Sequence, residues 1–341
     1  MSAHPQPMEE PPPVAMLKII EGFWASRSVY VAAKLGLPDL LKDGAKTTEE
    51  LAATTGTHAP SLYRLLRALV SIGVFAEDEM GKFSLTPLGA TLRTDVPGSL
   101  RFIVIEELGE NHYPAWEKLL YSLKTGAIAF NHVYGNSKWH YMTEHEDEAR
   151  IFDQAMASFG GATAAAVIEA YDFSASKRVV DMGGGNGSFL ATILKANPQV
   201  RGVLFDVPHV VEAASRYLES EGVMSRCEVV GGDFFQSAPP ADLYLLRWII
   251  HDWDDVRSVA ILKHCCEAMS AGGKVLLVEA VLKPGRATSF AKFLDLNMLV
   301  MTGGLERTEA EYANLLSAAG LKLARIIPTH TVMSVIEAVG A

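Results

Sequence analysis

The sequence is poor in cysteine, which limits the classes of protein it can belong to. Its 341 residues include three cysteines, Cys227 and the adjacent Cys265 and Cys266. Three thiols at this spacing form neither the disulfide framework of a small secreted protein nor a metal-binding motif. We therefore expect reduced, buried thiols in a cytoplasmic protein.

The sequence also lacks an excess of positive charge and long apolar runs. It holds 40 acidic and 30 basic side chains, a formal net charge of −10 at pH 7. Nucleic-acid-binding proteins usually present a basic face. No uncharged apolar stretch reaches the ~18 residues of a membrane span, and no cationic and then apolar leader is visible. We therefore expect neither nucleic acid nor a membrane as a partner.

The remaining composition is that of an ordinary globular protein, with 49% hydrophobic and 21% charged residues. The length allows two domains of ~150 residues each. Residues 1–14 differ from the rest because they are rich in proline, and we expect a disordered tail there.

Residues 15–100 show helical patterns. Apolar side chains recur at helical spacing in the first of them, at Met16, Ile19, Ile20, Phe23 and Trp24. A further helix over 60–70 is followed by two short strands around 78–81, an order that is typical of a winged helix. This helix offers only Arg64 and Arg67 as cations, and the wing is acidic. We therefore expect a dimerisation domain rather than a DNA-binding one.

Residues 101–170 indicate further helices. Residues 171–341 show a different sequence pattern. Apolar runs alternate there with helical segments, and the runs cover 178–182, 202–206, 227–230, 242–247 and 274–281. This alternation predicts an α/β domain with a parallel sheet. Ligands of such sheets bind beyond the carboxyl ends of the strands.

A glycine-rich loop directly follows the first of these runs. Asp181 precedes the alternating Gly183, Gly185 and Gly187, and a helical segment begins at Ser188. Glycine allows the backbone to turn sharply and to approach a ligand closely, and the N–H groups at a helix start face that ligand. The pattern predicts a site for a nucleotide-bearing cofactor; the alternative is a tight turn in an ordinary α/β domain.

A second acid refines this prediction. Asp206 lies about 20 residues after Gly187, where a carboxylate commonly binds ribose hydroxyls. Ser188 stands where the dinucleotide fingerprint requires glycine, and no phosphate-binding lysine follows. The additional carboxylate of Asp181 favours an adenosine ligand with a positive group, such as S-adenosylmethionine, over a pyrophosphate.

A candidate for proton transfer follows the fourth run. His251 lies between Trp248 and Trp253, and an imidazole with an ordinary pKa of ~6.5 suits proton abstraction from a phenol. Glu279 ends the fifth run and Glu306 precedes a helix, so either could hold the imidazole. Alternatively, His251 only caps the next helix. The acids at 252, 254 and 255 do not converge on a metal ion by their spacing, and we expect no metal.

Five motifs occur in a fixed order: the glycine loop, Asp206, the run 231–235, the run 247–253 and the run 303–308. Together they resemble the plant caffeate-type and bacterial natural-product O-methyltransferases, which use S-adenosylmethionine and release S-adenosylhomocysteine. The resemblance covers about residues 15–338. It implies a winged-helix dimerisation domain before a Rossmann-like methyltransferase domain, with residues 101–170 as a helical linker that contributes to the acceptor pocket.

The resemblance also implies roles for single residues. His251 would be the general base, with Glu279 and Glu306 beside it. Cofactor contacts would come from Asp181, Gly183, Gly185, Asp206, Val207, Asp233, Phe234 and Arg247. The acceptor pocket would include Met156, Phe159, Trp248, Met298 and Met301. Phe159 stands where plant relatives often have histidine, which argues against a plant-type phenylpropanoid acceptor.

These observations predict a metal-independent methyltransferase, a homodimer, that acts on the hydroxyl of an aromatic small molecule. Two alternatives stay open. A relative could bind the same cofactor but methylate nitrogen, or use the cofactor in decarboxylation or hydroxylation. A winged-helix regulator could sense a ligand through its second domain, although the acidic charge argues against it.

Overall fold

The computed structural model describes residues 11–285 and 289–341, apart from the side chains of Phe159 and Ala162. The chain forms two compact units, which divide in sequence between Gly109 and Glu110. Each unit has its own apolar core.

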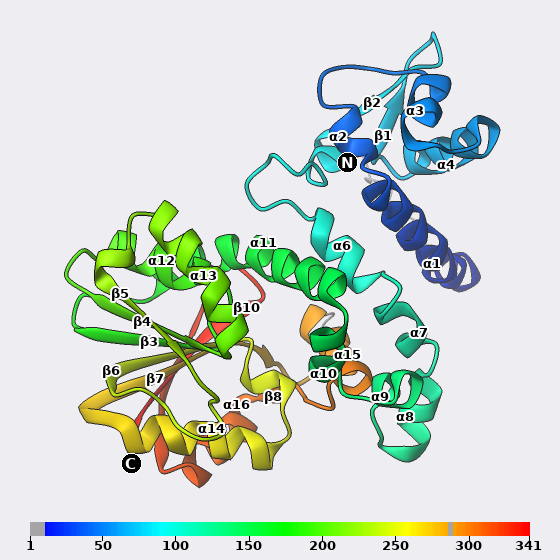
Figure 1. The fold of residues 1–341 in the computed structure, drawn as a ribbon. Coiled ribbons are helices and arrows are strands. Elements are labelled where there is room, and N and C mark those ends of the chain that lie inside the picture. Colours follow the sequence, from blue (N-terminus) through cyan, green and yellow to red (C-terminus); the bar gives the residue numbers. More distant parts are fainter. Residues whose placement is uncertain (1–10, 286–288) are drawn as a thin grey trace, which may run out of the picture. The chain divides into compact units, whose positions relative to one another are not determined.

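The first unit is mainly helical and contains a short hairpin (Figure 1). Its elements are α1 (Pro12–Lys34), α2 (Leu37–Leu40), α3 (Thr48–Thr55), α4 (Ala59–Ser71), β1 (Phe75–Glu77), β2 (Phe83–Leu85), α5 (Pro87–Ala90) and α6 (Arg101–Glu107). Thr47 and Glu50 form a capping box that fixes the start of α3. Leu51, Leu66 and Phe83 are fully buried between these elements. The predicted winged helix is confirmed.

The prediction of a disordered tail through residue 14 is wrong for its last residues, because α1 already begins at Pro12. Proline has a fixed φ that suits the first turn of a helix, where its missing N–H costs nothing. Residues 1–10 lie outside the described part of the chain.

The first helix has an unusual surface. Its apolar side chains lie largely in contact with solvent, at Val14, Met16, Leu17, Ile19, Ile20, Phe23 and Trp24. Ile19 is 72% exposed and Trp24 is 63% exposed. A contiguous apolar surface of this kind is typical of a protein interface.

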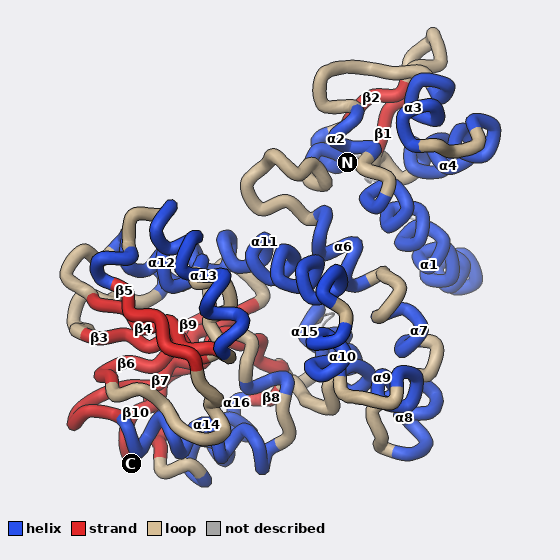
Figure 2. Tube along the Cα trace, viewed as in Figure 1, coloured by secondary structure: helices blue, strands red, loops and turns tan. Residues whose placement is uncertain are grey.

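The second unit holds a sheet with helices on both faces (Figures 1 and 2). Its helices are α7 (His112–Trp116), α8 (Leu119–Thr125), α9 (Ala129–Tyr134), α10 (Lys138–Glu144), α11 (Glu146–Ala170), α12 (Ser188–Ala196), α13 (Pro208–Ser220), α14 (Asp255–Ala268), α15 (Phe290–Met301) and α16 (Glu309–Ala318). Two short 3₁₀ helices are η1 (Met224–Arg226) and η2 (Ile250–Asp252).

The strands are β3 (Arg178–Met182), β4 (Arg201–Asp206), β5 (Cys227–Gly231), β6 (Ala241–Arg247), β7 (Met269–Leu282), β8 (Arg307–Thr308), β9 (Leu321–Pro328) and β10 (Met333–Gly340). They lie in the order β5-β4-β3-β6-β7-β10-β9, and β8 pairs with β7. The five predicted strands form the parallel part of this sheet. The antiparallel β9 and β10, which complete the sheet, were not predicted.

One described helix, α11, is long and apolar enough to cross a membrane by length and composition alone. A core helix passes the same test. Ala164 and Val167 of α11 are fully buried in the cluster that includes Phe189 and Leu190 of α12. The packing of α11 is therefore that of a core helix against one face of the sheet.

Candidate active site

The glycine loop between β3 and α12 has the backbone geometry that its sequence predicts. Gly183, Gly185 and Gly187 have φ values of +66°, +58° and +79°, in the left-handed region that favours glycine. A Cβ on Gly183 would also lie 2.5 Å from Cδ1 of Ile249, so a side chain there would require the Ile249 side chain to move. The loop thus leaves its backbone open to a ligand at the start of α12.

Asp206, at the end of β4, connects this loop to the neighbouring strand. Its Oδ2 accepts a hydrogen bond of 2.9 Å from the Gly185 N–H, and its Oδ1 accepts one of 2.7 Å from the Val207 N–H. Burial raises the pKa of Asp206, and these two N–H groups oppose that effect. The carboxylate is placed as predicted, with Val207 exposed beside it.

Asp181 lies beneath the loop, opposite Arg247 at the end of β6. Burial raises the pKa of Asp181 to about 7, although the charge of Arg247 lowers it. Within the described residues, Oδ2 of Asp181 and Nη1 of Arg247 are buried without a hydrogen-bond partner. A Cβ on Gly160 of α11 would lie 3.5 Å from that Nη1. An unmatched buried donor and acceptor fit the carboxylate and ammonium groups of an amino-acid moiety.

Aromatic side chains line the loop on its other side. Phe234 follows β5, and its ring lies 3.5 Å from the position of a Cβ on Gly183. The Phe234 and Phe235 rings are 4.9 Å apart, and Trp253 packs edge-on against Phe235 at 4.8 Å. Oδ1 of Asp233 accepts a hydrogen bond of 2.8 Å from the Phe235 N–H. The structure thus brings Phe234 to the glycine loop, and Asp233 precedes it at an exposed position; the adenine contacts of both residues stay a prediction.

His251 lies in η2, directly after β6, and is 5% exposed. Its Nδ1 is 2.7 Å from Oε1 of Glu306 and 3.9 Å from Oε2 of Glu279. Its Nε2 is 3.9 Å from Oδ1 of Asp252. Glu279 and Glu306 are almost fully buried. The three residues predicted to act together therefore form one buried cluster.

The carboxylates decide the charge of this cluster. Burial alone would lower the pKa of His251, but Glu279, Asp252 and Glu306 outweigh burial and raise it to about 10. Burial raises the pKa of Glu279, against the effect of the His251 charge. His251 consequently binds a proton much more strongly than a histidine in water.

The loop before α16 holds His251 in place. The Leu305 N–H donates to the His251 carbonyl at 2.9 Å. A Cβ on Gly304 would lie 1.9 Å from the same carbonyl oxygen, so only glycine fits. The Glu306 N–H donates to Asp295 of α15 at 2.9 Å, which fixes the carboxylate that contacts the imidazole.

Arg307 is a positioning residue that sequence reasoning missed, although its motif was identified. It is 1% exposed. Its guanidinium donates to the carbonyls of Ile250 and Trp253 at 3.2 and 3.0 Å, on either side of His251. It also donates to Oδ1 of Asp255 at 3.0 and 2.8 Å. Arg307 therefore fixes both ends of η2.

Of the residues predicted to line the acceptor pocket, the structure shows one next to His251. Trp248 lies close to the imidazole, with 6.1 Å between the ring centroids. Met156 is half-buried on α11, and the side chain of Phe159 lies outside the described part. Met298 and Met301 are buried on α15, and Met301 belongs to an apolar cluster with Phe130. The pocket role of these residues stays a prediction.

A buried polar network joins α7 to α15 and was also missed. Nε2 of His112 and Nε1 of Trp116 each lie 2.7 Å from Oδ1 of Asn297. Asn297 is next to Met298, so this network fixes the helix that carries two predicted pocket residues. The partners are 185 and 181 residues apart, and no local pattern reveals them.

His251, Glu279 and Glu306 are also the described residues whose potential ligand atoms, within 4.8 Å of one another, could surround a metal ion. In the sequence, the set considered for such a role was His251 with Asp252, Asp254 and Asp255, whose spacing does not converge on one ion. His251 and Glu306 already share a hydrogen bond of 2.7 Å, and Oε1 of Glu279 accepts two backbone N–H groups. These contacts suit a proton-transfer cluster better than an open metal site.

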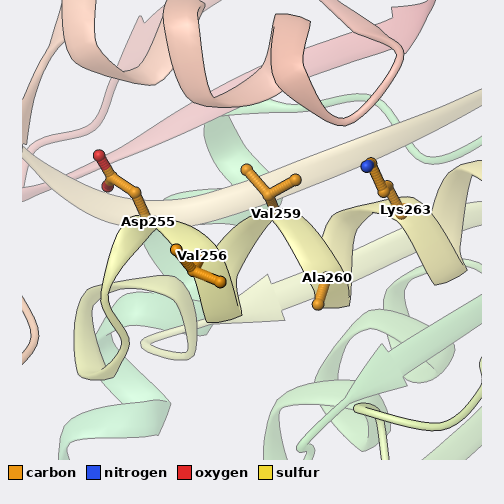
Figure 3. Close-up of a pocket in the computed structure, with 5 residues that line it drawn as sticks. All are labelled: Asp255, Val256, Val259, Ala260 and Lys263. Carbon is orange, nitrogen blue, oxygen red and sulfur yellow. The ribbon is translucent and has the colours of Figure 1, made fainter.

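A shallow depression of about 430 Å³ lies along α14 (Figure 3). It is lined by Asp255, Val256, Val259, Ala260 and Lys263. None of these residues was predicted to bind the cofactor or the acceptor. We therefore assign it no part in the reaction.

Two family models match this chain. The O-methyltransferase domain matches residues 116–322, and the O-methyltransferase dimerisation domain matches residues 17–95. The first match covers more than half of the chain, and the chain therefore belongs to the O-methyltransferase family.

Two relatives show the range of this family. The chain is 47% identical to phenazine O-methyltransferase PhzM of Lysobacter antibioticus over 324 residues, which is 95% of each chain. It is 34% identical to the phenazine-1-carboxylate N-methyltransferase of Pseudomonas aeruginosa, over 94% of this chain and 96% of that one.

Solved structures agree with this assignment. The crystal structure of LaPhzM matches with a TM-score of 0.94 and 46% identity, over 97% of this chain and all of that one. The O-methyltransferase NcsB1, solved with S-adenosylmethionine and a hydroxylated naphthoic acid, matches with a TM-score of 0.80 and 34% identity, over 93% and 96%. The family and the methyl donor predicted from the motifs, S-adenosylmethionine, are confirmed.

Proposed function

We propose that this protein transfers a methyl group from S-adenosylmethionine to a hydroxyl of an aromatic small molecule, with His251 as the general base. The observation that carries this proposal is the buried contact of 2.7 Å between Nδ1 of His251 and Glu306. A carboxylate in this position fixes the unprotonated imidazole as the tautomer with its proton on Nδ1, so Nε2 is the atom that accepts a proton above the raised pKa of His251.

The residues around the glycine loop fit the methyl donor. Asp206 and Val207 would hold its ribose, and Phe234 its adenine. Asp181 and Arg247, which have an unmatched acceptor and donor, would hold its amino-acid moiety. Bound there, S-adenosylmethionine would supply a methyl group on a sulfonium, whose sulfur leaves readily as the neutral thioether of S-adenosylhomocysteine.

The protein then has two tasks, positioning and proton removal. Nε2 of His251 accepts the hydroxyl proton of the acceptor as its oxygen becomes nucleophilic. Glu306 and Glu279 stabilise the imidazolium that forms, because both are within 4 Å of Nδ1. Trp248 provides a flat aromatic surface next to the imidazole for the acceptor ring.

We propose a hydroxylated phenazine as the first acceptor to test, since the similarity to PhzM extends over 95% of both chains. Nitrogen methylation is the second candidate, because the relative from Pseudomonas aeruginosa acts on nitrogen. An aromatic nitrogen without a proton needs no base. The His251–Glu306 pair therefore favours the hydroxyl.

The experiment supplies the protein with S-adenosylmethionine and each of three acceptors: a hydroxyphenazine, phenazine-1-carboxylate and a hydroxynaphthoate. Mass spectrometry detects the added methyl group, and NMR of the product assigns it to oxygen or nitrogen. We expect O-methylation in the presence of EDTA. Exclusive N-methylation contradicts the proposed function, and a loss of activity that magnesium restores contradicts metal independence.

A further inference from the structure

Trp248, between β6 and η2, has a backbone conformation that is rare for its residue type. Its φ is +54°, the only positive φ among the described non-glycine residues. A bulky side chain in this region is disfavoured and persists only where its surroundings hold it. Here the indole donates to Sδ of Met333 at 2.9 Å and packs against the core.

The conformation of Trp248 changes the direction of the next two N–H groups. Ile249 follows with φ −111° and ψ −51°, in the right-handed region. A left-handed residue followed by a right-handed one brings successive N–H groups into a concave nest that binds anions. The N–H groups of Ile249 and Ile250 donate to the same atom, Oε1 of Glu279, at 3.1 and 3.0 Å.

We propose that Trp248 is a positioning residue that acts through its backbone: it builds a nest of two N–H groups that favours the ionised Glu279 carboxylate and so strengthens the binding of a proton by His251. The inference rests on the proposed function, in which His251 accepts the proton of the acceptor.

The surroundings of Glu279 explain why a nest is needed. Its carboxylate is fully buried, and its Oε2 has no hydrogen-bond partner among the described residues. Burial and the nearby acids favour the neutral form, and the charge of His251 and the N–H groups of Ile249 and Ile250 counteract them. The N–H groups of the nest therefore stabilise the ionised Glu279 carboxylate even when His251 has lost its proton.

Other charged and titratable groups also surround the pair of Glu279 and His251. They are Glu306, Asp252, Arg247, Arg307, Lys138 and Tyr312. A substitution of Trp248 alters none of these groups. A comparison between variants at position 248 therefore isolates the effect of the backbone conformation on the pKa of His251.

The test compares Trp248→Gly with Trp248→Val. Both variants lack the indole, but glycine adopts positive φ freely, whereas the β-branched valine strongly disfavours it. The pKa of His251 is measured by NMR with ¹⁵N-labelled histidine, and His251→Ala assigns the signal. We expect a pKa in the valine variant that is lower by about one unit or more, since an opposite charge at this distance has an effect of that size.

The same pair is then made with Glu279→Gln, which removes the charge that the nest binds. The difference between glycine and valine should disappear in that background. Equal pKa values with Glu279 present, or a difference that persists in the Glu279→Gln background, overturn the proposal. If the valine variant does not fold by circular dichroism, Trp248→Ala takes its place in the same comparison.

The pH dependence of turnover gives a second readout. The acidic limb of kcat should lie at lower pH in the valine variant than in the glycine variant. If His251 is not the general base, the acidic limb of kcat should be absent in both variants, but their His251 pKa values should still differ by NMR. If the nest has no effect, the acidic limb of kcat should remain, but the His251 pKa values of the two variants should be equal. The two outcomes are therefore distinguishable.

Discussion

At the scale of single residues, the site depends on how three carboxylates surround one imidazole. Glu306 makes the shortest contact, and Glu279 and Asp252 lie 3.9 Å from the two ring nitrogens. The resulting rise in the pKa of His251 has a thermodynamic consequence. The imidazolium stabilises the folded protein fully below the unfolded pKa of ~6.5, and this contribution is lost as the pH rises through the folded-state pKa.

Glu306→Gln should reveal this effect in the pH dependence of kcat. A general base works only when it is unprotonated, so activity appears above its pKa. Because the charge of Glu306 raises the pKa of His251, its removal should move the acidic limb to lower pH. The plateau of kcat should also fall, since the imidazole loses its orientation. An acidic limb at the wild-type pH would show that Glu306 does not act on His251.

Asp206→Ala should weaken the binding of S-adenosylmethionine at least tenfold, the loss of a charged hydrogen bond at ~1.5–3 kcal/mol. The substitution removes the acceptor of the Gly185 N–H and the predicted partner of the ribose. Isothermal titration calorimetry measures the change, with the exposed Glu212→Ala on α13 as the control. Equal affinity in both variants would place the cofactor elsewhere.

Most of these residues could be predicted from the sequence because their motifs are local. The glycine loop, Asp206 and the run around His251 each lie where a strand ends. Arg307 and Asn297 could not be assigned in the same way, because their partners lie 57 and 185 residues away. Such contacts exist only after folding.

At the scale of elements, η2 is held between β6 and the loop before α16. Gly304→Ala tests this arrangement, because its Cβ would lie 1.9 Å from the His251 carbonyl oxygen, an atom of the backbone. We expect a loss of stability of about 1–3 kcal/mol and a fall in kcat, as η2 has to shift.

Gly161→Ala on α11 is the matched control. A Cβ there meets nothing within 4 Å, and alanine suits a helix interior better than glycine. Chemical denaturation and turnover should both remain close to the wild type or improve slightly. If Gly304→Ala behaves like this control, the close approach of the two loops is not essential.

The parallel strands were predictable because each contains an apolar run, and β3, β4, β6 and β7 are largely buried along that run. The strands β9 and β10 were not predicted, since polar residues interrupt both runs: β9 is largely exposed, and β10 is mostly buried but contains Ser334 and Glu337. β9 has the sequence Leu321 to Pro328 at the edge of the sheet, with several exposed positions. Its place depends on pairing with β10 rather than on a pattern of its own.

At the scale of the whole molecule, the exposed apolar face of α1 needs a partner. The match to an O-methyltransferase dimerisation domain covers this helix from residue 17, and we propose that a second copy of the chain covers the face. Ile19→Asp combined with Trp24→Asp would place charges at two of its most exposed apolar positions.

Light scattering at micromolar concentration should give the mass of a dimer for the wild type and of a monomer for this double variant. Lys18→Asp, on the same helix, serves as a control for the added charge. A monomeric wild type, or a dimer that the double variant leaves intact, would contradict this interface.

The measurement that tests the central claim most directly is the turnover of His251→Ala on the methylated acceptor, as a function of pH. The account predicts a loss of ~10²–10⁴ in kcat at the pH optimum of the wild type, where His251 is unprotonated. Affinity for S-adenosylmethionine should stay close to normal because Asp206 and Arg247 remain. The control is His330→Ala, a substitution of an exposed histidine, which should behave as the wild type. Activity should partly return as the pH approaches the pKa of the acceptor hydroxyl, because an ionised acceptor needs no base. Full turnover of His251→Ala at the pH optimum of the wild type would contradict the account.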